Sequence, residues 1–162
     1  MKVIVAVDEN WAIGKGGDQL VYLSADLKRF QALTTGHSIL LGRKTLATFP
    51  GGRPLKNRRN LILSATPGYT VQGGEVFSTW EEALNAADGN TYVVGGESVY
   101  RQFLPFCDTA YVTKIRHAFP ADRYFPNLDE DPAWKVMETE GPFVQGEMLF
   151  FYVTYRRIQA SR

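Results

Sequence analysis

Asp26 is an acidic residue at a position where the surrounding pattern predicts an apolar side chain. Ser24 is a favourable helix N-cap and Gly36 a favourable helix end, so the sequence predicts a helix from the residue after Ser24 to about Thr35. At about 100° per residue, Asp26 falls within the apolar stripe of this helix. The stripe is formed by Leu27, Phe30 and Leu33. A carboxylate there must be hydrogen-bonded or line a pocket, because an unpaired buried charge is costly.

A second interpretation of Asp26 needs no pocket. An acid in the first turn favours the helix dipole, and Arg29 on the next turn could pair with it. Asp26 alone favours this second interpretation, so the rest of the chain has to decide.

Two predicted strand-to-helix corners carry groups that suit phosphate. These corners are Gly95-Gly96 and Gly42-Arg43-Lys44-Thr45. Backbone N–H groups at a glycine corner can approach an anion closely, and cations at a helix start call for one. The alternative for Gly95-Gly96 is a tight turn that needs glycine for its backbone conformation alone. The alternative for Gly42-Arg43-Lys44-Thr45 is a solvated surface. Together the corners predict a nucleotide with several phosphates.

Other reactive side chains give weaker signals. Arg58 and Arg59 precede a predicted strand, and either guanidinium could bind a carboxylate bidentately, although the sequence alone favours a solvated pair. Cys107 follows Pro105 and is expected to be structural. No Ser/His/Asp or Cys/His arrangement is evident, so nucleophilic catalysis is not expected.

Composition bounds the class of protein. The chain has 162 residues, of which 44% are hydrophobic, and this suits one domain spanning residues 1–162. A net charge of +1 without a basic block makes nucleic acid and anionic membranes poor partners. One cysteine and two histidines argue against a disulfide framework and an all-Cys/His zinc site, so no metal is expected.

The N-terminal residues and the apolar runs predict where the chain resides and how it assembles. The chain opens directly into a strand-like run after Lys2, and no apolar run approaches membrane length. We therefore expect a cytoplasmic protein. A monomer is expected because no isolated apolar stretch requires a partner.

The elements that must position these groups follow an alternating order. Near-continuous apolar runs predict strands buried on both faces, as in a parallel sheet. They cover residues 2–7, 38–42, 59–64 and 91–94, with further strands at 75–77 and 109–115. Shorter helices are predicted over 43–49, from the Thr79-x-x-Glu82 capping box to about 88, and from 97 to Pro105. Residues 8–18 form a glycine-rich stretch that predicts a functional loop.

The C-terminal third changes character, since residues 134–140 and 147–156 predict an antiparallel pair. The whole pattern predicts an α/β fold: a mostly parallel central sheet of about eight strands with an antiparallel C-terminal edge and about four flanking helices. Ligands are expected at the carboxyl ends of the strands.

The chain resembles the dihydrofolate reductase family from Val3 to about Tyr155, because it carries a series of short family motifs in the same order. The motifs that carry the resemblance are Ala6-Val7-Asp8, Trp11-Ala12-Ile13-Gly14, Leu23 to Phe30, Leu41 to Thr45, Gly52 to Leu55, Arg58 to Ser64, Val94 to Tyr100, Val112 to Ile115 and Phe125-Pro126. Each is short, but their order and spacing are shared. The resemblance implies an oxidoreductase of tetrahydrofolate biosynthesis in one-carbon metabolism and a target of antifolate inhibitors.

The implied reaction is NADPH-dependent reduction of 7,8-dihydrofolate to 5,6,7,8-tetrahydrofolate. Hydride passes from nicotinamide C4 to pterin C6, and water protonates N5 under the influence of Asp26. The resemblance makes Asp26 the carboxylate that binds pterin N3 and the 2-amino group, with Thr113 supporting it through a bound water. The loop over residues 13–20 controls water access.

The resemblance also implies two sets of binding residues. On the substrate side these are Ile4, Val5, Asp26, Leu27, Phe30, Phe49, Leu55, Arg58 at the glutamate α-carboxylate, Val94, Tyr100 and Thr113. On the cofactor side Ala6, Ile13 and Gly14 flank nicotinamide, while Thr45, Gly95, Gly96, Glu97, Ser98 and Val99 surround the pyrophosphate. Gly42, Arg43, Lys44, Leu63, Ser64 and Val94 complete this set, and the cationic pair favours NADPH over NADH. A cis Gly95-Gly96 bond is also implied.

Two positions depart from the family pattern. Leu20-Val21 replaces a common Pro-Trp pair, so proton delivery is expected to use Tyr22 or water alone. Phe49 replaces a smaller aliphatic residue. The competing interpretations are a related reductase of riboflavin biosynthesis, a non-catalytic nucleotide-binding protein and a phosphate-binding interaction module. Asp26 and Arg58 argue against the first.

Overall fold

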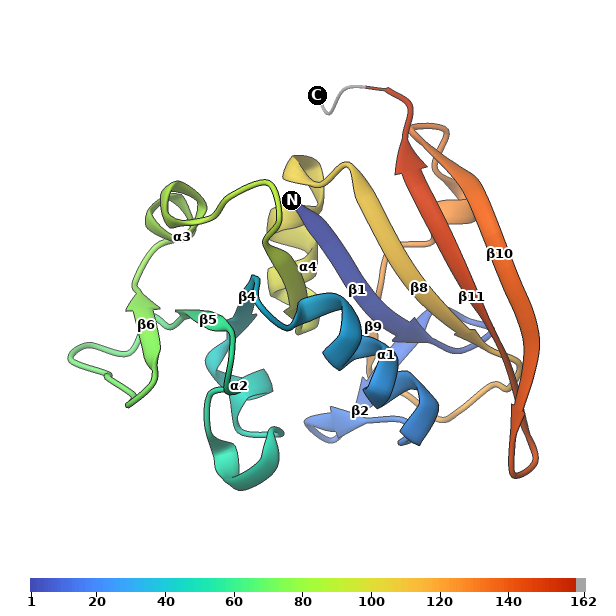
Figure 1. Cartoon of the computed structure of the whole chain (residues 1–162), viewed down its shortest axis with the longest axis horizontal. Helices are drawn as coiled ribbons and strands as arrows, with labels where there is room; N and C mark the ends of the chain where they lie inside the picture. Colours follow the sequence, from blue (N-terminus) through green and yellow to red (C-terminus); the bar gives the residue numbers. More distant parts are fainter. Residues whose placement is uncertain (160–162) are drawn as a thin grey trace.

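Eight strands form the central sheet in the order β10-β11-β8-β1-β7-β4-β5-β6 (Figure 1). The structure is a computed structural model and describes residues 1–159. The strands are β1 (Lys2–Val7), β4 (Ser38–Gly42), β5 (Arg59–Leu63), β6 (Gly74–Phe77), β7 (Tyr92–Gly95), β8 (Thr109–Ile115), β10 (Trp134–Gln145) and β11 (Met148–Arg157). Pairing is parallel from β8 through β1 to β6, and antiparallel where β11 meets β8 and β10. The predicted fold class is confirmed.

Helices connect the parallel strands. They are α1 (Ser24–Thr34), α2 (Arg43–Leu46), α3 (Trp80–Ala86) and α4 (Glu97–Phe103), with short 3-10 turns at Pro50–Gly52, Leu104–Phe106 and Leu128–Glu130. Thr79 is the predicted N-cap of α3, because its hydroxyl accepts a hydrogen bond from the Glu82 backbone N–H at 3.3 Å. The Glu82 carboxylate accepts from the Thr79 hydroxyl at 3.1 Å. Helix α2 ends earlier than the predicted residue 49. None of the helices in residues 1–159 is long and apolar enough to cross a membrane.

Strand β1 differs from the prediction of burial on both faces. Val3, Val5 and Val7 are buried with residues of α4, whereas Ile4 and Ala6 on the opposite face are only half-buried. Ile4 and Ala6 are among the residues that line a cavity at this face of the sheet. The apolar run therefore reflects one packed face and one ligand-accessible face.

The segment expected to be a long loop is mostly a hairpin. Strands β2 (Ala12–Lys15) and β3 (Asp18–Gln19) pair antiparallel, and β9 (Arg123–Tyr124) adds to β2 in a second small sheet. Gly16 and Gly17 have φ angles of 62° and 84°, the left-handed region that a two-residue hairpin turn requires. The prediction of irregular structure was wrong here because the glycines close a tight turn.

Candidate functional site

A cavity of about 1580 Å³ follows the carboxyl ends of β1, β4, β5 and β7. Single ligands of drug size usually fill about 300 to 1,000 Å³, so this cavity has room for two. Its lining includes every sequence-predicted site residue except Thr113, which is buried behind Asp26.

Asp26 lies on the cavity side of α1 and is tied to β8. The Thr113 hydroxyl donates directly to Asp26 Oδ1 at 2.5 Å, which corrects the expected water bridge. Burial raises the pKa of the Asp26 carboxyl, while the Thr113 hydrogen bond and the Arg29 charge partly oppose that rise. The alternative ion pair between Arg29 and Asp26 is not among the salt bridges of residues 1–159. The Arg29 guanidinium instead lies 4.0 Å from the centre of the Tyr152 ring.

Helix α1 begins differently from the prediction. Leu23 holds the extended N-cap position, and Ser24 is the first helical residue rather than the cap. The Ser24 hydroxyl and the Ala25 N–H instead both donate to Gln145 Oε1 of β10, each at 3.3 Å. A side chain from the far end of the sequence thus caps the helix that carries Asp26.

The rest of α1 follows the predicted pattern in part. Leu27 and Phe30 line the cavity, whereas Leu33 packs into the core beside β4. Gly36, with φ of 84°, allows the chain to leave the helix, and Thr35 is the C-cap.

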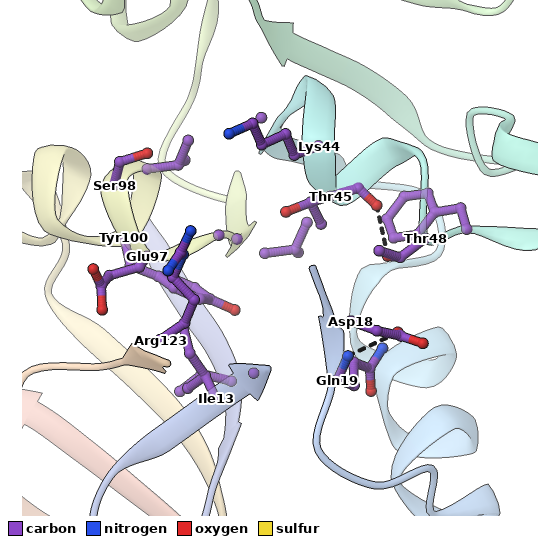
Figure 2. Close-up of a pocket in the computed structure, with 18 of the residues that line it drawn as sticks. Ile13, Asp18, Gln19, Lys44, Thr45, Thr48, Glu97, Ser98, Tyr100 and Arg123 are labelled. Atoms are coloured by element: carbon purple, nitrogen blue, oxygen red, sulfur yellow. Dashed lines mark hydrogen bonds between the residues drawn. The ribbon is translucent and has the colours of Figure 1, made fainter. Parts of the chain in front are cut away.

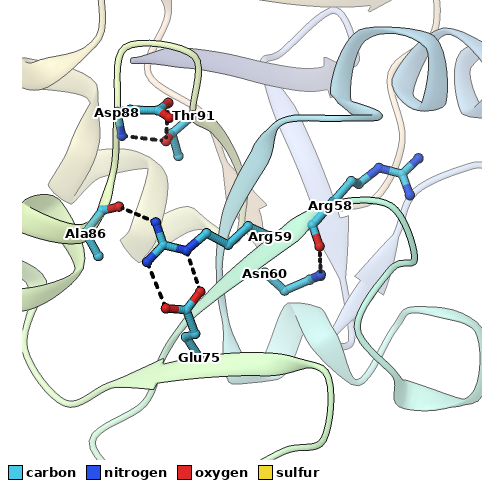
Figure 3. Close-up of polar contacts among 7 residues, drawn as sticks. All are labelled: Arg58, Arg59, Asn60, Glu75, Ala86, Asp88 and Thr91. Carbon is cyan, nitrogen blue, oxygen red and sulfur yellow. Dashed lines mark hydrogen bonds and ion pairs between the residues drawn. The ribbon is translucent and has the colours of Figure 1, made fainter.

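The two adjacent arginines have different roles (Figure 3). Arg59 forms an ion pair with Glu75 of β6, with hydrogen bonds of 2.5 and 2.8 Å, and also donates to the Ala86 carbonyl. Arg58 points away from that pair and lines the cavity. Within residues 1–159, no acidic side chain lies within 4 Å of the Arg58 guanidinium, so it keeps an unpaired charge for a ligand.

Arg58 is held in place by neutral partners. Its Nε donates to the Thr34 hydroxyl at 2.8 Å, and its two terminal nitrogens donate to the Lys56 carbonyl and the Thr35 hydroxyl. These contacts fix the guanidinium at the end of α1 without neutralising it. Such a group is suited to bidentate binding of a carboxylate.

The two glycine corners meet at one edge of the cavity. The Gly95-Gly96 peptide bond is cis, as the resemblance implied. A Cβ atom at either glycine would lie 3.4 Å from the Thr45 hydroxyl, and a Cβ at Gly42 would lie 3.3 Å from a Val99 methyl. The lack of side chains therefore keeps the corners close together and their backbone open to a ligand.

Tyr100 connects the glycine corner with β1. Its hydroxyl donates to the Ile4 carbonyl at 2.8 Å, and burial raises the pKa of this phenol, so it stays protonated. The Ile4 carbonyl keeps a second lone pair for a ligand donor.

Tyr22 lies at the rim of the cavity and is 52% exposed. Its hydroxyl donates to the Asp18 carboxylate, and this hydrogen bond, with some burial, raises the pKa of Tyr22. In this arrangement the Tyr22 proton is engaged by β3 rather than directed at Asp26.

Some lining residues were missed by the sequence prediction. They include Asp18, Gln19, Gln31, Thr48, Thr66, Trp80, Gln102 and Arg123. Arg123 carried a usable signal, because it is a cation just before the motif Phe125-Pro126. The remainder are common polar or apolar types whose position depends on tertiary packing.

Cys107 lies outside the cavity and is buried, as expected for a structural residue. Burial raises the pKa of its thiol to about 12, and its Sγ is 3.3 Å from the Phe103 carbonyl oxygen. The residues that the structure describes contain no group of three or more His, Cys, Asp or Glu side chains placed to hold a metal ion.

Residues 1–157 match the family model described as "Dihydrofolate reductase". The chain belongs to the dihydrofolate reductase family. Dihydrofolate reductase from Bacillus subtilis is 40% identical over 139 residues, covering 85% of this chain and 81% of the relative. Dihydrofolate reductase from Mycobacterium tuberculosis is 35% identical over 149 residues, covering 90% of each chain. The family prediction and the prediction of an enzyme are confirmed.

A solved dihydrofolate reductase structure from Enterococcus faecalis gives a TM-score of 0.87 at 34% identity, covering 98% of this chain and 96% of that one. That protein was solved in complex with NADP(H) and RAB-propyl. The similarity therefore extends over the whole sheet and both of its edges. The match favours dihydrofolate reductase over the related reductase of riboflavin biosynthesis.

Proposed function

We propose that the chain catalyses the NADPH-dependent reduction of 7,8-dihydrofolate to 5,6,7,8-tetrahydrofolate. The observation that carries this proposal is Asp26, a carboxylate with a raised pKa, held by Thr113 in a cavity large enough for two ligands. When bound, NADPH supplies hydride from nicotinamide C4 to pterin C6. The E. faecalis relative described with NADP(H) supports the choice of cofactor.

The cofactor side of the cavity suits NADPH. Nicotinamide would lie beside Ala6, Ile13 and Gly14. The diphosphate would lie at the open corner of Gly95 to Val99 and Thr45, and the adenosine with its 2'-phosphate near Gly42, Arg43, Lys44, Leu63 and Ser64. Two adjacent cations at that end favour a cofactor with an extra phosphate, so NADPH is preferred over NADH.

The substrate side would place the pterin against Asp26. The carboxylate accepts hydrogen bonds from pterin N3–H and the 2-amino group, and its charge raises the basicity of N5 electrostatically. The Ile4 and Val94 carbonyls contact the same ring. Leu27, Phe30, Phe49 and Leu55 enclose the pterin and aminobenzoyl groups, with Val5 and Tyr100 behind them, and exclude water from the reacting carbons.

The glutamate tail would reach Arg58. Its guanidinium is unpaired among the described residues and is fixed by Thr34 and Thr35 at the cavity wall. An α-carboxylate can accept two parallel hydrogen bonds from it.

Water would deliver the proton to N5. Val21 lines the cavity where an indole is common in the family, and a valine side chain has no hydrogen to donate. The Tyr22 hydroxyl is engaged by Asp18, so water alone is favoured over Tyr22. The hairpin over residues 13–20 would control when that water enters.

The same site would bind antifolate inhibitors in place of the pterin. We further propose that the protein works as a cytoplasmic monomer with one domain over residues 1–162. The ligand named RAB-propyl in the E. faecalis complex supports binding of a second small molecule beside the cofactor.

The test is loss of NADPH absorbance with dihydrofolate across pH, comparing the wild type with Asp26→Asn. The variant should lose about 100-fold or more of its rate at neutral pH and recover part of it in acid, where the substrate is already protonated. Glu138→Gln is the matched control, because it removes one carboxylate from the exposed face of β10.

Equal activity of the wild type and Asp26→Asn would remove Asp26 from the mechanism. If neither protein turns over, the reductase of riboflavin biosynthesis becomes the better candidate. Tight NADPH binding by an inactive wild type would identify a nucleotide-binding protein that has kept the fold.

A further inference from the structure

Arg123 in β9 brings a positive charge into the cavity that the proposed function does not yet use. Its side chain is 57% exposed, and one terminal nitrogen donates to the Asp122 carbonyl at 3.0 Å. In the part of the chain that the structure describes, its only acidic neighbour within 4 Å is Asp122, at 3.9 Å. This ion pair is long and both side chains are about half exposed, so it is weak and leaves the Arg123 guanidinium able to bind a ligand.

Glu97 is an unexpected residue at the glycine corner, because a carboxylate repels the phosphates proposed to bind there. Its Oε1 accepts the backbone N–H of Tyr124 at 2.6 Å. Glu97 is thereby directed at β9, and it connects the start of α4 to the residue that follows Arg123. No ion pair joins Glu97 and Arg123 among residues 1–159.

Two backbone contacts fix the position of Arg123. It pairs with Gly14 in the β2–β9 ladder, and the neighbouring Tyr124 is tied to Glu97. Arg123 therefore lies between the proposed nicotinamide site at the hairpin and the proposed diphosphate site at Gly95-Gly96.

Figure 2 shows the direction of the side chain. Arg123 extends from β9 toward Glu97 and Ser98, while Thr45 and Lys44 lie on the other side of the cavity. A dinucleotide that runs along this edge would pass between the two groups. A guanidinium is well suited to bind a diphosphate there, because its donors match two phosphate oxygens at once.

We propose that Arg123 binds the diphosphate of NADPH opposite Thr45, and that Glu97 positions it through the Tyr124 N–H. This inference rests on the proposed function, since it assumes that NADPH occupies the cavity. The proposal also explains why Glu97, an acid, lies at the glycine corner. The hydrogen bond that Glu97 accepts from Tyr124 holds Arg123 near the proposed diphosphate site, and the positive charge of Arg123 compensates for the negative charge of Glu97.

The first experiment measures the Kd of NADPH and of NADH by calorimetry for Arg123→Gln. Loss of a charged hydrogen bond to a partly exposed group should raise both Kd values by about 10-fold. Both cofactors should be affected equally, because they share the diphosphate and differ at the 2'-phosphate. The dependence of Kd on salt should also weaken.

The matched control is Arg101→Gln. Arg101 is exposed on α4 and lies outside the cavity lining, so its loss changes the net charge equally without removing a ligand. In turnover, Arg123→Gln should raise the KM for NADPH, with kcat and the KM for dihydrofolate close to those of Arg101→Gln.

The role of Glu97 is tested by two variants. Glu97→Gln keeps an oxygen that can accept the Tyr124 N–H, so its Kd for NADPH should equal or fall below that of the wild type. Glu97→Ala loses the contact and should approach Arg123→Gln. The double variant, Glu97→Ala with Arg123→Gln, should lose little more than Arg123→Gln alone, because both changes remove one interaction.

The inference is overturned if Arg123→Gln and Arg101→Gln have equal Kd values while the wild type turns over, and the proposed function then stands. It is also overturned if Arg123→Gln weakens NADPH but not NADH, since the contact would then be to the 2'-phosphate. A wild type that binds no NADPH overturns the inference and the proposed function together.

Discussion

The buried carboxylate of Asp26 lowers the free energy of unfolding when it is ionised, so its effect on stability depends on pH. Burial raises its pKa in the folded protein, so its contribution to stability is fully present below the ordinary carboxyl pKa and is lost as pH rises through the folded value. Asp26→Asn removes the charge and should raise the free energy of unfolding above that window by on the order of 1 kcal/mol. The gain should shrink in acid, where both side chains are neutral.

Urea unfolding at pH 8 and in acid checks this expectation, with Glu138→Gln as the exposed control. A difference between Asp26→Asn and the wild type that is the same at every pH would show that the ionised carboxylate carries no burial penalty. The variant that loses activity is thus expected to be the more stable protein at neutral pH.

The adjacent arginines provide a matched pair for substrate recognition. Arg58→Gln should raise the KM for dihydrofolate by roughly 10- to 100-fold, because a charged hydrogen bond to the glutamate tail is lost. A dihydropterin substrate that lacks the tail should show no such change. Steady-state kinetics with the two substrates measure the effect, and Arg59→Gln should leave both KM values unchanged. Equal effects on both substrates would contradict the role given to Arg58.

At this scale the sequence identifies residue types better than their partners. Both arginines could be nominated, but only the parallel pairing of β5 with β6 brings Glu75 to Arg59 and leaves Arg58 unpaired. Likewise, Asp26 could be recognised as anomalous, whereas its direct bond to Thr113 depends on how closely α1 packs against β8.

At the scale of elements, the start of α1 depends on the distant β10. Gln145 accepts hydrogen bonds from both Ser24 and Ala25, so it replaces the cap that Leu23 cannot supply. Gln145→Ala should lower the free energy of unfolding by about 1 kcal/mol, the usual effect of losing a cap. It should also reduce kcat, because α1 carries Asp26.

Chemical denaturation and turnover test the Gln145 prediction together. Gln72→Ala, at an exposed loop position, is the control for removing a glutamine side chain. If both variants behave alike, the α1 terminus does not need the contact with β10.

Local patterns predicted the elements that are organised locally and failed where a distant partner decides. The N-cap at Thr79 and its contacts with Glu82 lie within four residues, and this cap formed as expected. The hairpin over β2 and β3 was missed, because β2 also pairs on its other edge with β9, more than a hundred residues later along the chain. Ser24 was misassigned as a cap for the same reason.

At the scale of the whole molecule, the proposed cofactor would contact several separate elements around the cavity, from the β2–β3 hairpin to the glycine corners, and would hold them together. NADPH at about 100 times its Kd should stabilise the fold by about 2.7 kcal/mol. For a chain of this size, that corresponds to a rise in Tm of about 5 to 10 °C. Thermal unfolding with and without NADPH measures the shift, and NADH at the same concentration should give a smaller one. Equal shifts would contradict the proposed preference for the 2'-phosphate.

The order of strands and helices was predictable, because alternating apolar runs and helix signals specify a parallel sheet. The half-exposure of β1 was not, since its apolar face toward the cavity has the same composition as a packed face. A pocket for aromatic rings and a hydrophobic core select the same residue types, so composition alone cannot separate them.

The position of β1 has a consequence for synthesis of the chain. Residues 2–7 are synthesised before both of their neighbours in the sheet, β7 and β8, which end at Gly95 and Ile115. Strand β1 must therefore wait until the chain has been made as far as Gly95 before one of its edges is covered, and as far as Ile115 before the other is. Such late, non-local pairing slows folding and exposes an apolar strand during translation, which makes this segment a natural target for chaperones that act on nascent chains.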